Sequence, residues 1–223
     1  MRRIAASAVV ALGALGGLLS GVAAADRDTA DAARVDWAAG WVIAGGTGLA
    51  DRHAPSPAVA LGTSRRGAED AARRRIAQAL GALPLAAGGT LSDRLRDAAV
   101  KAGVDAAVEA AIPVAAEPET DGSWHVTLAV PLEALRLALA APRPLAAAGD
   151  RGPATIVVDG VAARPAIGWT VAGIPAATLW VKDVPAWARG APRVTARSAR
   201  AGAIDADLAS ATPATLFVIV AKR

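Results

Sequence analysis

The chain has 223 residues, with 24 Lys and Arg against 20 Asp and Glu, and it contains no cysteine. The lack of cysteine excludes a disulfide scaffold, a thiolate metal site, a cysteine nucleophile and a lipid attached to an N-terminal cysteine. The positive charges are interleaved with acids, so no extended basic surface for nucleic acid is expected. The length is sufficient for one large domain or two small ones.

The first 25 residues have the pattern of a secretion signal. Arg2 and Arg3 precede an uncharged run from Ile4 to Ala25, and small residues stand just before Asp26. We therefore expect cleavage after residue 24 or 25, a periplasmic or secreted protein, and no membrane span after cleavage. The alternative is an inner-membrane anchor that keeps the segment, because the uncharged run is long enough to cross a bilayer. Residues 26–34 are short and polar, and we expect them to form a flexible leader or one loose helical turn.

Residues 35–80 predict a strand, a glycine-rich turn and an amphipathic helix. Over residues 35–43 the odd positions 35, 37, 41 and 43 carry Val, Trp, Trp and Ile, which predicts one apolar face. Residues 45–48 (Gly-Gly-Thr-Gly) are interpreted as a structural turn, because they lack the lysine and the spacing of a phosphate-binding loop. The helix is expected to begin at Ser64 as its N-cap. Its apolar stripe is formed by small and aliphatic residues: Ala68, Ala72, Ile76 and Leu80.

Three tryptophans complete this predicted core. Trp37, Trp41 and Trp124 are expected on the same face of one sheet, packed against the apolar stripe of the helix. On this interpretation Trp41→Ala costs about 3–5 kcal/mol through lost burial and a cavity. Ala72→Leu costs about 1–3 kcal/mol through overpacking, and Arg73→Ala costs no more than ~0.5 kcal/mol.

The rest of the first unit predicts two further helices and a hairpin. Residues 90–93 begin the second helix, and Gly103 is a candidate break within it. Residues 112–131 form a hairpin around Asp121 and Gly122, whose sequence favours a tight type I′ turn. A third helix begins at Pro131. The predicted order is β-α-α-β-β-α, an α+β domain over residues 26–140 with its helices packed on an antiparallel sheet.

A second, β-rich unit is predicted after a linker. Residues 141–153 are rich in Pro and Gly and have no periodic apolar residues, which is typical of a linker. Residues 154–223 then predict a small β-rich domain with strands at 155–159, 178–183, 193–197 and 215–221. The last of these strands is apolar on both faces, so it should be a central strand.

A set of packing and turn motifs runs through both units. The first unit carries Asp36-Trp37, Gly40-Trp41, residues 44–48, the helix at 68–80, and Asp121-Gly122 followed by residues 126–132; the second carries residues 156–159, 164–166 and 207–210. Together they resemble the LPP-twenty type of bacterial envelope lipoprotein, a family related to the N-terminal domain of the flagellar assembly protein T. The resemblance implies a non-catalytic α+β protein of the cell envelope with a role in assembly or structure. This sequence lacks the family's lipid-bearing cysteine, so the resemblance does not extend to lipid anchoring.

Residues for catalysis or metal binding are few. His53 and His125 fall in a loop and on a strand, and their spacing does not predict a shared metal site. An alternative function, an exported hydrolase of cell-envelope polymers, would depend on the aspartates of the second unit: Asp159, Asp183, Asp205 and Asp207. Their spacing gives them no common face. We therefore predict that the protein is not an enzyme and that it holds no metal or cofactor.

The surface of the first helix is the candidate partner-binding site. Arg65, Arg66, Arg73 and Arg74, followed by Arg75, lie away from the apolar stripe. Such a surface can dock an acidic envelope protein or an anionic envelope polymer, whereas the alternative is an ordinary solvated helix surface. The sequence thus predicts an exported structural or assembly protein of the envelope, with its partner unidentified.

Overall fold

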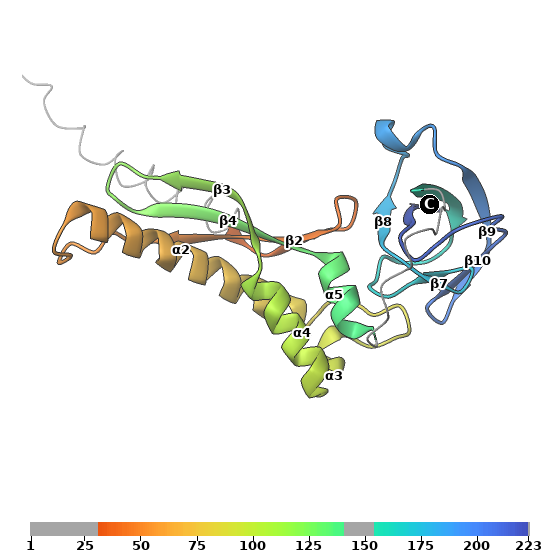
Figure 1. Ribbon diagram of the computed structural model, residues 1–223, viewed down its shortest axis with the longest axis horizontal. Coiled ribbons are helices and arrows are strands. Elements are labelled where there is room, and N and C mark those ends of the chain that lie inside the picture. Colours follow the sequence, from red (N-terminus) through yellow and green to blue (C-terminus); the bar gives the residue numbers. More distant parts are fainter. Residues whose placement is uncertain (1–30, 141–153, 223) are drawn as a thin grey trace, which may run out of the picture.

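The protein is described by a computed structural model that covers residues 31–140 and 154–222. It contains two β-sheets with helices beside the first, which confirms the mixed α+β class (Figure 1). The predicted signal peptide at residues 1–25 and the predicted linker at 141–153 lie outside the described residues. Among the helices that are described, none is long and apolar enough to cross a membrane.

The first sheet is antiparallel and has the strand order β1-β2-β4-β3. Helix α2 lies along one face of it, and three shorter helices gather at one end (Figure 1). The strands are β1 (Arg34–Asp36), β2 (Trp41–Gly48), β3 (Ile112–Pro118) and β4 (Trp124–Pro131). The helices are α2 (Pro57–Leu80), α3 (Leu91–Arg94), α4 (Ala98–Glu109) and α5 (Leu132–Leu139). The predicted order is therefore correct except for one additional strand and one divided helix.

The single strand predicted over residues 35–43 is in fact a hairpin. Asp36 Oδ1 accepts hydrogen bonds from the backbone N–H groups of Ala38 at 3.1 Å and Ala39 at 2.9 Å, and Gly40 follows with φ of +78°. An aspartate that bonds its own backbone in this way reverses the chain. Trp37 therefore lies in the turn, and β2 begins at Trp41. Large residues stand at odd-numbered positions on both sides of this turn, which is why the sequence pattern concealed it.

Strand β2 buries the face opposite to the predicted one. Val42 and Ala44 are at most 1% exposed, whereas Trp41 is partly exposed. Gly46 and Gly48 continue the buried face, where a Cβ would lie 2.2 Å and 1.7 Å from backbone oxygens of α2. The helix backbone thus packs directly on the strand backbone. Residues 45–48 are this strand and not the predicted turn.

Helix α2 buries the predicted stripe of Ala68, Ala72, Ile76 and Leu80, but it begins earlier than predicted. Its N-cap is Ser56, whose Oγ accepts a hydrogen bond from the backbone N–H of Val59 at 3.3 Å. Ser64 is instead buried inside the helix, and its Oγ lies 3.0 Å from the carbonyl oxygen of Gly122. This residue ties the helix to the loop between β3 and β4.

The β3–β4 hairpin is confirmed, but its turn is longer than predicted. The N–H of Glu119 donates to the carbonyl oxygen of Ser123 at 2.8 Å, and that of Gly122 donates to Glu119 at 3.1 Å. Gly122 has φ of +83°, whereas Asp121 does not have positive φ as a type I′ turn requires. The predicted inward face of β4 is correct, because Val126 and Val130 are fully buried beside α2.

The second predicted helix is divided into α3 and α4. Thr90 and Asp93 form the predicted capping interaction, with the Thr90 N–H 2.8 Å from Asp93 Oδ2. Asp97 then caps α4 by accepting from the N–H of Ala99 at 2.9 Å, so the break lies before α4 and not at Gly103. Gly103 instead lets α5 approach, because a Cβ there would lie 2.9 Å from the Cβ of Ala138.

The second sheet is curled and has the order β7-β6-β10-β9-β5-β11-β8 (Figure 1). Its strands are β5 (Thr155–Val161), β6 (Thr170–Val171), β7 (Ile174–Pro175), β8 (Thr178–Val181), β9 (Arg193–Arg200), β10 (Ala203–Ala206) and β11 (Leu216–Ala221). As predicted, β11 lies between two strands and is parallel to both. Phe217 and Val218 of this strand are buried on opposite faces. The short strands β6, β7 and β10 were not predicted.

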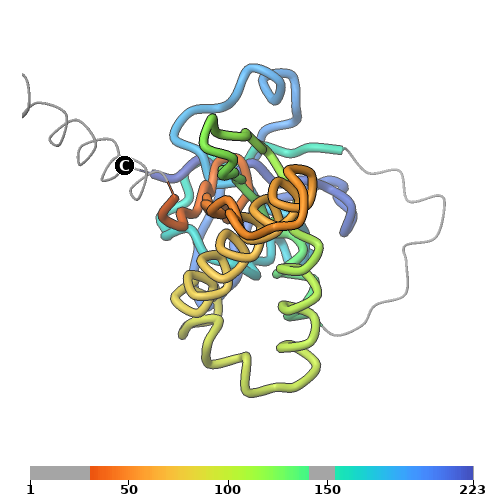
Figure 2. The backbone as a smooth tube through the Cα atoms, turned by 90° about the vertical axis from the view of Figure 1, so that its left-hand side faces the viewer, coloured from red at the N-terminus to blue at the C-terminus, as the bar shows by residue number. Residues whose placement is uncertain are grey.

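Large side chains fill the main core of the second sheet. Phe217 is fully buried, and the rings of Trp169 and Trp180 contact each other with centroids 5.8 Å apart. Trp37 packs against this core and also against that of the first sheet. Seen from the end of the molecule where α2 begins, the first sheet and its helices lie in front of the second sheet (Figure 2).

Candidate functional site

The first unit contains the first sheet and its helices, and the second unit contains the second sheet. The two units are joined through backbone hydrogen bonds. On one side the N–H of Trp180 donates to the carbonyl oxygen of Trp37 at 2.9 Å. On the other side Ile167 donates to the carbonyl oxygen of Pro84 at 3.0 Å and accepts from the N–H of Ala86 at 2.9 Å. Backbone contacts of this kind fix both distance and orientation. The surfaces between the units are therefore held in a defined arrangement.

Two glycines allow this close approach. A Cβ on Gly40 would lie 2.7 Å from Cδ2 of Leu179, and a Cβ on Gly202 would lie 3.2 Å from the backbone of Ala86. Both glycines also have positive φ, which side chains disfavour. The joint thus depends on small residues in turns of both units.

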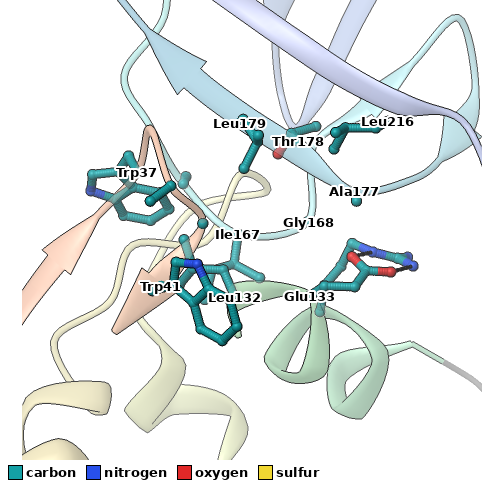
Figure 3. A pocket seen from close by; sticks show the side chains of 14 residues that line it. Trp37, Trp41, Leu132, Glu133, Ile167, Gly168, Ala177, Thr178, Leu179 and Leu216 are labelled. Atoms are coloured by element: carbon teal, nitrogen blue, oxygen red, sulfur yellow. Dashed lines mark hydrogen bonds and ion pairs between the residues drawn. The ribbon is translucent and has the colours of Figure 1, made fainter. Parts of the chain in front are cut away.

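A cleft of about 250 Å³ lies at this joint, and we call it the interunit cleft. Its walls come from the β1–β2 hairpin, from α5 and from β8 (Figure 3). Most of its lining is apolar, and the largest contributing side chains are Trp37, Trp41, Leu132, Ile167, Leu179 and Leu216. Trp41 is therefore a wall of this cleft and not the core residue that the sequence predicted.

One ion pair borders the interunit cleft. Arg136 Nε lies 2.7 Å from Glu133 Oε2, and Nη2 lies 2.6 Å from Oε1. Arg136 is the more buried partner, with 13% of its side chain exposed against 38% for Glu133. A bidentate pair between residues one helical turn apart holds the guanidinium in a fixed orientation.

The predicted partner-binding arginines divide into two groups. Arg65 and Arg73 are engaged by acids: Arg65 Nε lies 3.2 Å from Glu69 Oε1, and Arg73 Nη1 lies 3.3 Å from Asp70 Oδ1. Arg65 also lies over the ring of Trp124, with its guanidinium carbon 5.4 Å from the centroid. Both arginines therefore form ion pairs along the helix, and Arg65 also contacts β4 of the sheet.

Arg66 and Arg74 belong to the other group. Both are exposed, and within residues 31–140 and 154–222 neither has a carboxylate within ion-pair distance. Arg66 Nε donates to the carbonyl oxygen of Gly62 at 3.2 Å. Eight residues of helix separate the two arginines by about 12 Å along the axis.

A buried polar cluster was not predicted from the sequence. Asp31 is 2% exposed, and its Oδ2 accepts from Nη1 of Arg75 at 2.6 Å. The same Nη1 donates to the carbonyl oxygen of Gly45 at 2.9 Å, on the edge of β2 that β1 leaves unpaired. Arg75 thus reaches around the sheet edge from the helix side. Asp31 falls in the segment predicted as a flexible leader or one loose helical turn, so no local pattern pointed to it.

His125 completes this cluster without forming a catalytic relay. Its Nδ1 lies 3.4 Å from Asp31 Oδ1 and 3.5 Å from the hydroxyl of Thr47. A nucleophile–histidine–carboxylate relay needs contacts on opposite ring nitrogens. Here both contacts fall on one nitrogen, so the arrangement orients side chains at the sheet edge and does not activate Thr47.

The four aspartates of the second unit lie on separate elements. Asp159 on β5 forms a bidentate pair with Arg193 on β9, at 2.8 and 2.9 Å, and this hydrogen bonding raises the pKa of Arg193. Asp207 forms an ion pair with Arg197. None of the four lines the interunit cleft. Across the described ranges no three His, Cys, Asp or Glu residues are grouped so that they could hold a metal ion.

No protein-family model and no curated protein matches this chain. The resemblance to the LPP-twenty type of lipoprotein therefore stays a prediction.

Proposed function

We propose that the protein is an exported, non-enzymatic envelope protein that docks an acidic segment of a partner protein on the outer surface of α2. The observation that carries this proposal is the pair Arg66 and Arg74, both exposed and neither neutralised by a described carboxylate. Exposed guanidinium groups bind carboxylates through paired hydrogen bonds.

The charge on this surface supports an acidic partner. Four arginines (65, 66, 73 and 74) share the exposed side of α2 with only two acids, Glu69 and Asp70. The net charge of this side is therefore positive even after its internal ion pairs form. An extended peptide rises about 3.3 Å per residue, so acids four residues apart match the spacing of Arg66 and Arg74.

Photo-crosslinking in living cells tests the docking surface. A photoreactive amino acid replaces Gln78, an exposed residue one helical turn from Arg74, and the same amino acid replaces Arg189, an exposed residue of the second unit, as a control. We expect one discrete protein adduct from position 78 that disappears when Arg66→Glu is added and persists with Arg200→Glu. Equal adducts from both positions, or an adduct with an anionic polymer in place of a protein, would contradict the proposal.

Two further measurements test the other two parts of the proposal, that the protein is exported and that it is not an enzyme. N-terminal sequencing of the native protein should give a start at Ala25 or Asp26, because the leader has the pattern of a cleaved signal. A start at Met1 would favour the anchored alternative. Hydrolysis of cell-envelope polymers by the purified protein, abolished by Asp159→Asn, would contradict the non-enzymatic assignment.

A further inference from the structure

A second cleft of about 240 Å³ lies between the helices of the first unit and the second sheet. It shares Arg136, Ile167 and Gly168 with the interunit cleft, so the two clefts flank one segment of the chain. We call it the arginine cleft, because it contains two arginines and no acidic residue among its described lining. Its main walls are Leu85, Arg94, Arg136, Leu139, Ile167 and Trp169.

The two arginines differ in how their charge is balanced. Arg94 is exposed at the end of α3 and has no carboxylate within ion-pair distance in the described part of the chain. Arg136 uses Nε and Nη2 to bind Glu133. A guanidinium has a second edge that donates two parallel hydrogen bonds, through Nη1 and Nη2. Glu133 lines the interunit cleft and not this one, so it leaves that second edge of Arg136 available.

The second unit contributes an aromatic side chain. Trp169 is 6% exposed and lines the cleft, so its indole forms part of the apolar wall. The cleft therefore presents two guanidinium groups together with apolar and aromatic side chains.

We propose that the arginine cleft binds a small amphipathic carboxylate. Its polar groups donate and do not accept, which suits an anion and disfavours a cation or an alcohol. Its apolar walls, Leu85, Leu139 and Ile167, suit an uncharged body next to that anion. An apolar cavity of about 150 Å³ holds benzene, so this larger volume accommodates one ring with a short acidic chain.

This proposal concerns a different surface and a different ligand from the docking of a partner on α2, and either can fail without the other. The ligand carboxylate would lie between Arg94 and Arg136, and its body would reach towards Trp169. All three residues can contact one molecule only if the two units are held together. The hydrogen bonds of Ile167 to Pro84 and Ala86 hold them in this way.

Isothermal titration of the full chain with 4-phenylbutyrate tests the proposal. Two ligands with the same body serve as controls, 4-phenylbutanol for the charge and 4-phenylbutylamine for its sign. We expect saturable binding of the acid and at least ~10-fold weaker binding of both controls, since a charge-assisted bidentate contact is lost.

Variants then locate the binding site. Arg94→Gln should weaken binding of the acid by ~10-fold or more, because it removes one of the two guanidinium groups. Arg189→Gln, which removes the same charge from an exposed position elsewhere, should change affinity by less than ~2-fold. Arg94 is exposed, so its variant should fold normally.

Three results would overturn the proposal. These are no saturable binding of 4-phenylbutyrate by the folded wild-type chain, equal affinity for the acid and the alcohol, and binding of the acid that Arg94→Gln leaves unchanged. The last two would place the ligand on an apolar surface outside the arginine cleft.

Discussion

The two units close their cores in opposite ways. In the first, α2 lies directly on β2, because Gly46 and Gly48 leave no side chains between the two backbones. In the second, Phe217 and the contacting rings of Trp169 and Trp180 fill the space within a curled sheet. Sensitivity to mutation therefore does not follow residue size. The first unit should be most sensitive at its smallest residues, and the second at its largest.

The largest effect is expected for Gly48→Val. The new Cβ would meet the carbonyl oxygen of Ser64 at 1.7 Å, a backbone atom that cannot move without displacing α2. We expect a loss of at least ~4 kcal/mol in the free energy of unfolding, measured by denaturant titration. As a matched control, Gly62→Ala places a Cβ 3.9 Å from Arg66 Nη2 inside the same helix. It should stabilise the protein by up to about 1 kcal/mol. Equal effects of Gly48→Val and Gly62→Ala would show that the close contact of α2 with β2 does not make Gly48 sensitive.

The second unit should show the reverse dependence on size. Phe217→Ala removes a fully buried ring and should cost about 3–5 kcal/mol in the free energy of unfolding. Phe217→Leu retains most of the buried volume and should cost less than ~1.5 kcal/mol. Chemical denaturation followed by tryptophan fluorescence would measure both. A similar cost for the two variants would show that packing in this core does not depend on side-chain volume.

Trp41→Ala should have a smaller effect than its size suggests. The sequence predicts about 3–5 kcal/mol for a core tryptophan, but Trp41 lies on the wall of the interunit cleft and is partly exposed. We expect a cost of about 1–2 kcal/mol from the apolar area that becomes solvated. Thermal unfolding of Trp41→Ala and Phe217→Ala, measured side by side, would test this expectation. An equal loss of stability in both variants would show that Trp41 is a core residue.

The smallest expected effect is a pH dependence at the N-terminus of α3. The N–H of Thr90 donates to Asp93, which lowers the pKa of this carboxyl group; the Thr90 hydroxyl and nearby Arg96 act in the same direction. Because the folded pKa is below the unfolded one, the contribution is present above about pH 4 and is lost as the pH falls through the folded pKa. Asp93→Asn should flatten the fall of Tm between about pH 4 and pH 2. An unchanged acid profile would show that this cap is not linked to stability.

Local patterns in the sequence predicted the elements that depend on neighbouring residues. The four-residue spacing from Ala68 to Leu80 identified the buried stripe of α2, and the alternation after Trp124 identified the inner face of β4. The uniformly apolar run that begins at Leu216 identified the central strand β11. In each case the periodicity of one segment is sufficient to predict its burial.

Features that depend on contact between distant segments were not predicted. The prediction of which face of β2 is buried was wrong, because Gly46 and Gly48 are covered by the backbone of α2. A hydrophobicity pattern does not show such burial. Both clefts combine segments of the two units that lie far apart in the sequence. Asp31 and Arg75 are likewise 44 residues apart in the sequence. These features require the tertiary fold, so spacing within one segment carries no signal for them.

Both clefts are built across the joint between the two units. Amide hydrogen exchange of the full chain tests this joint through the N–H groups of Ile167 and Trp180, whose acceptors are Pro84 and Trp37 in the other unit. We predict protection of both amides comparable to that of Val126 and Phe217 in the two cores. Exchange of both at the rate of exposed loop amides, while the two cores stay protected, would contradict the joint and both clefts with it.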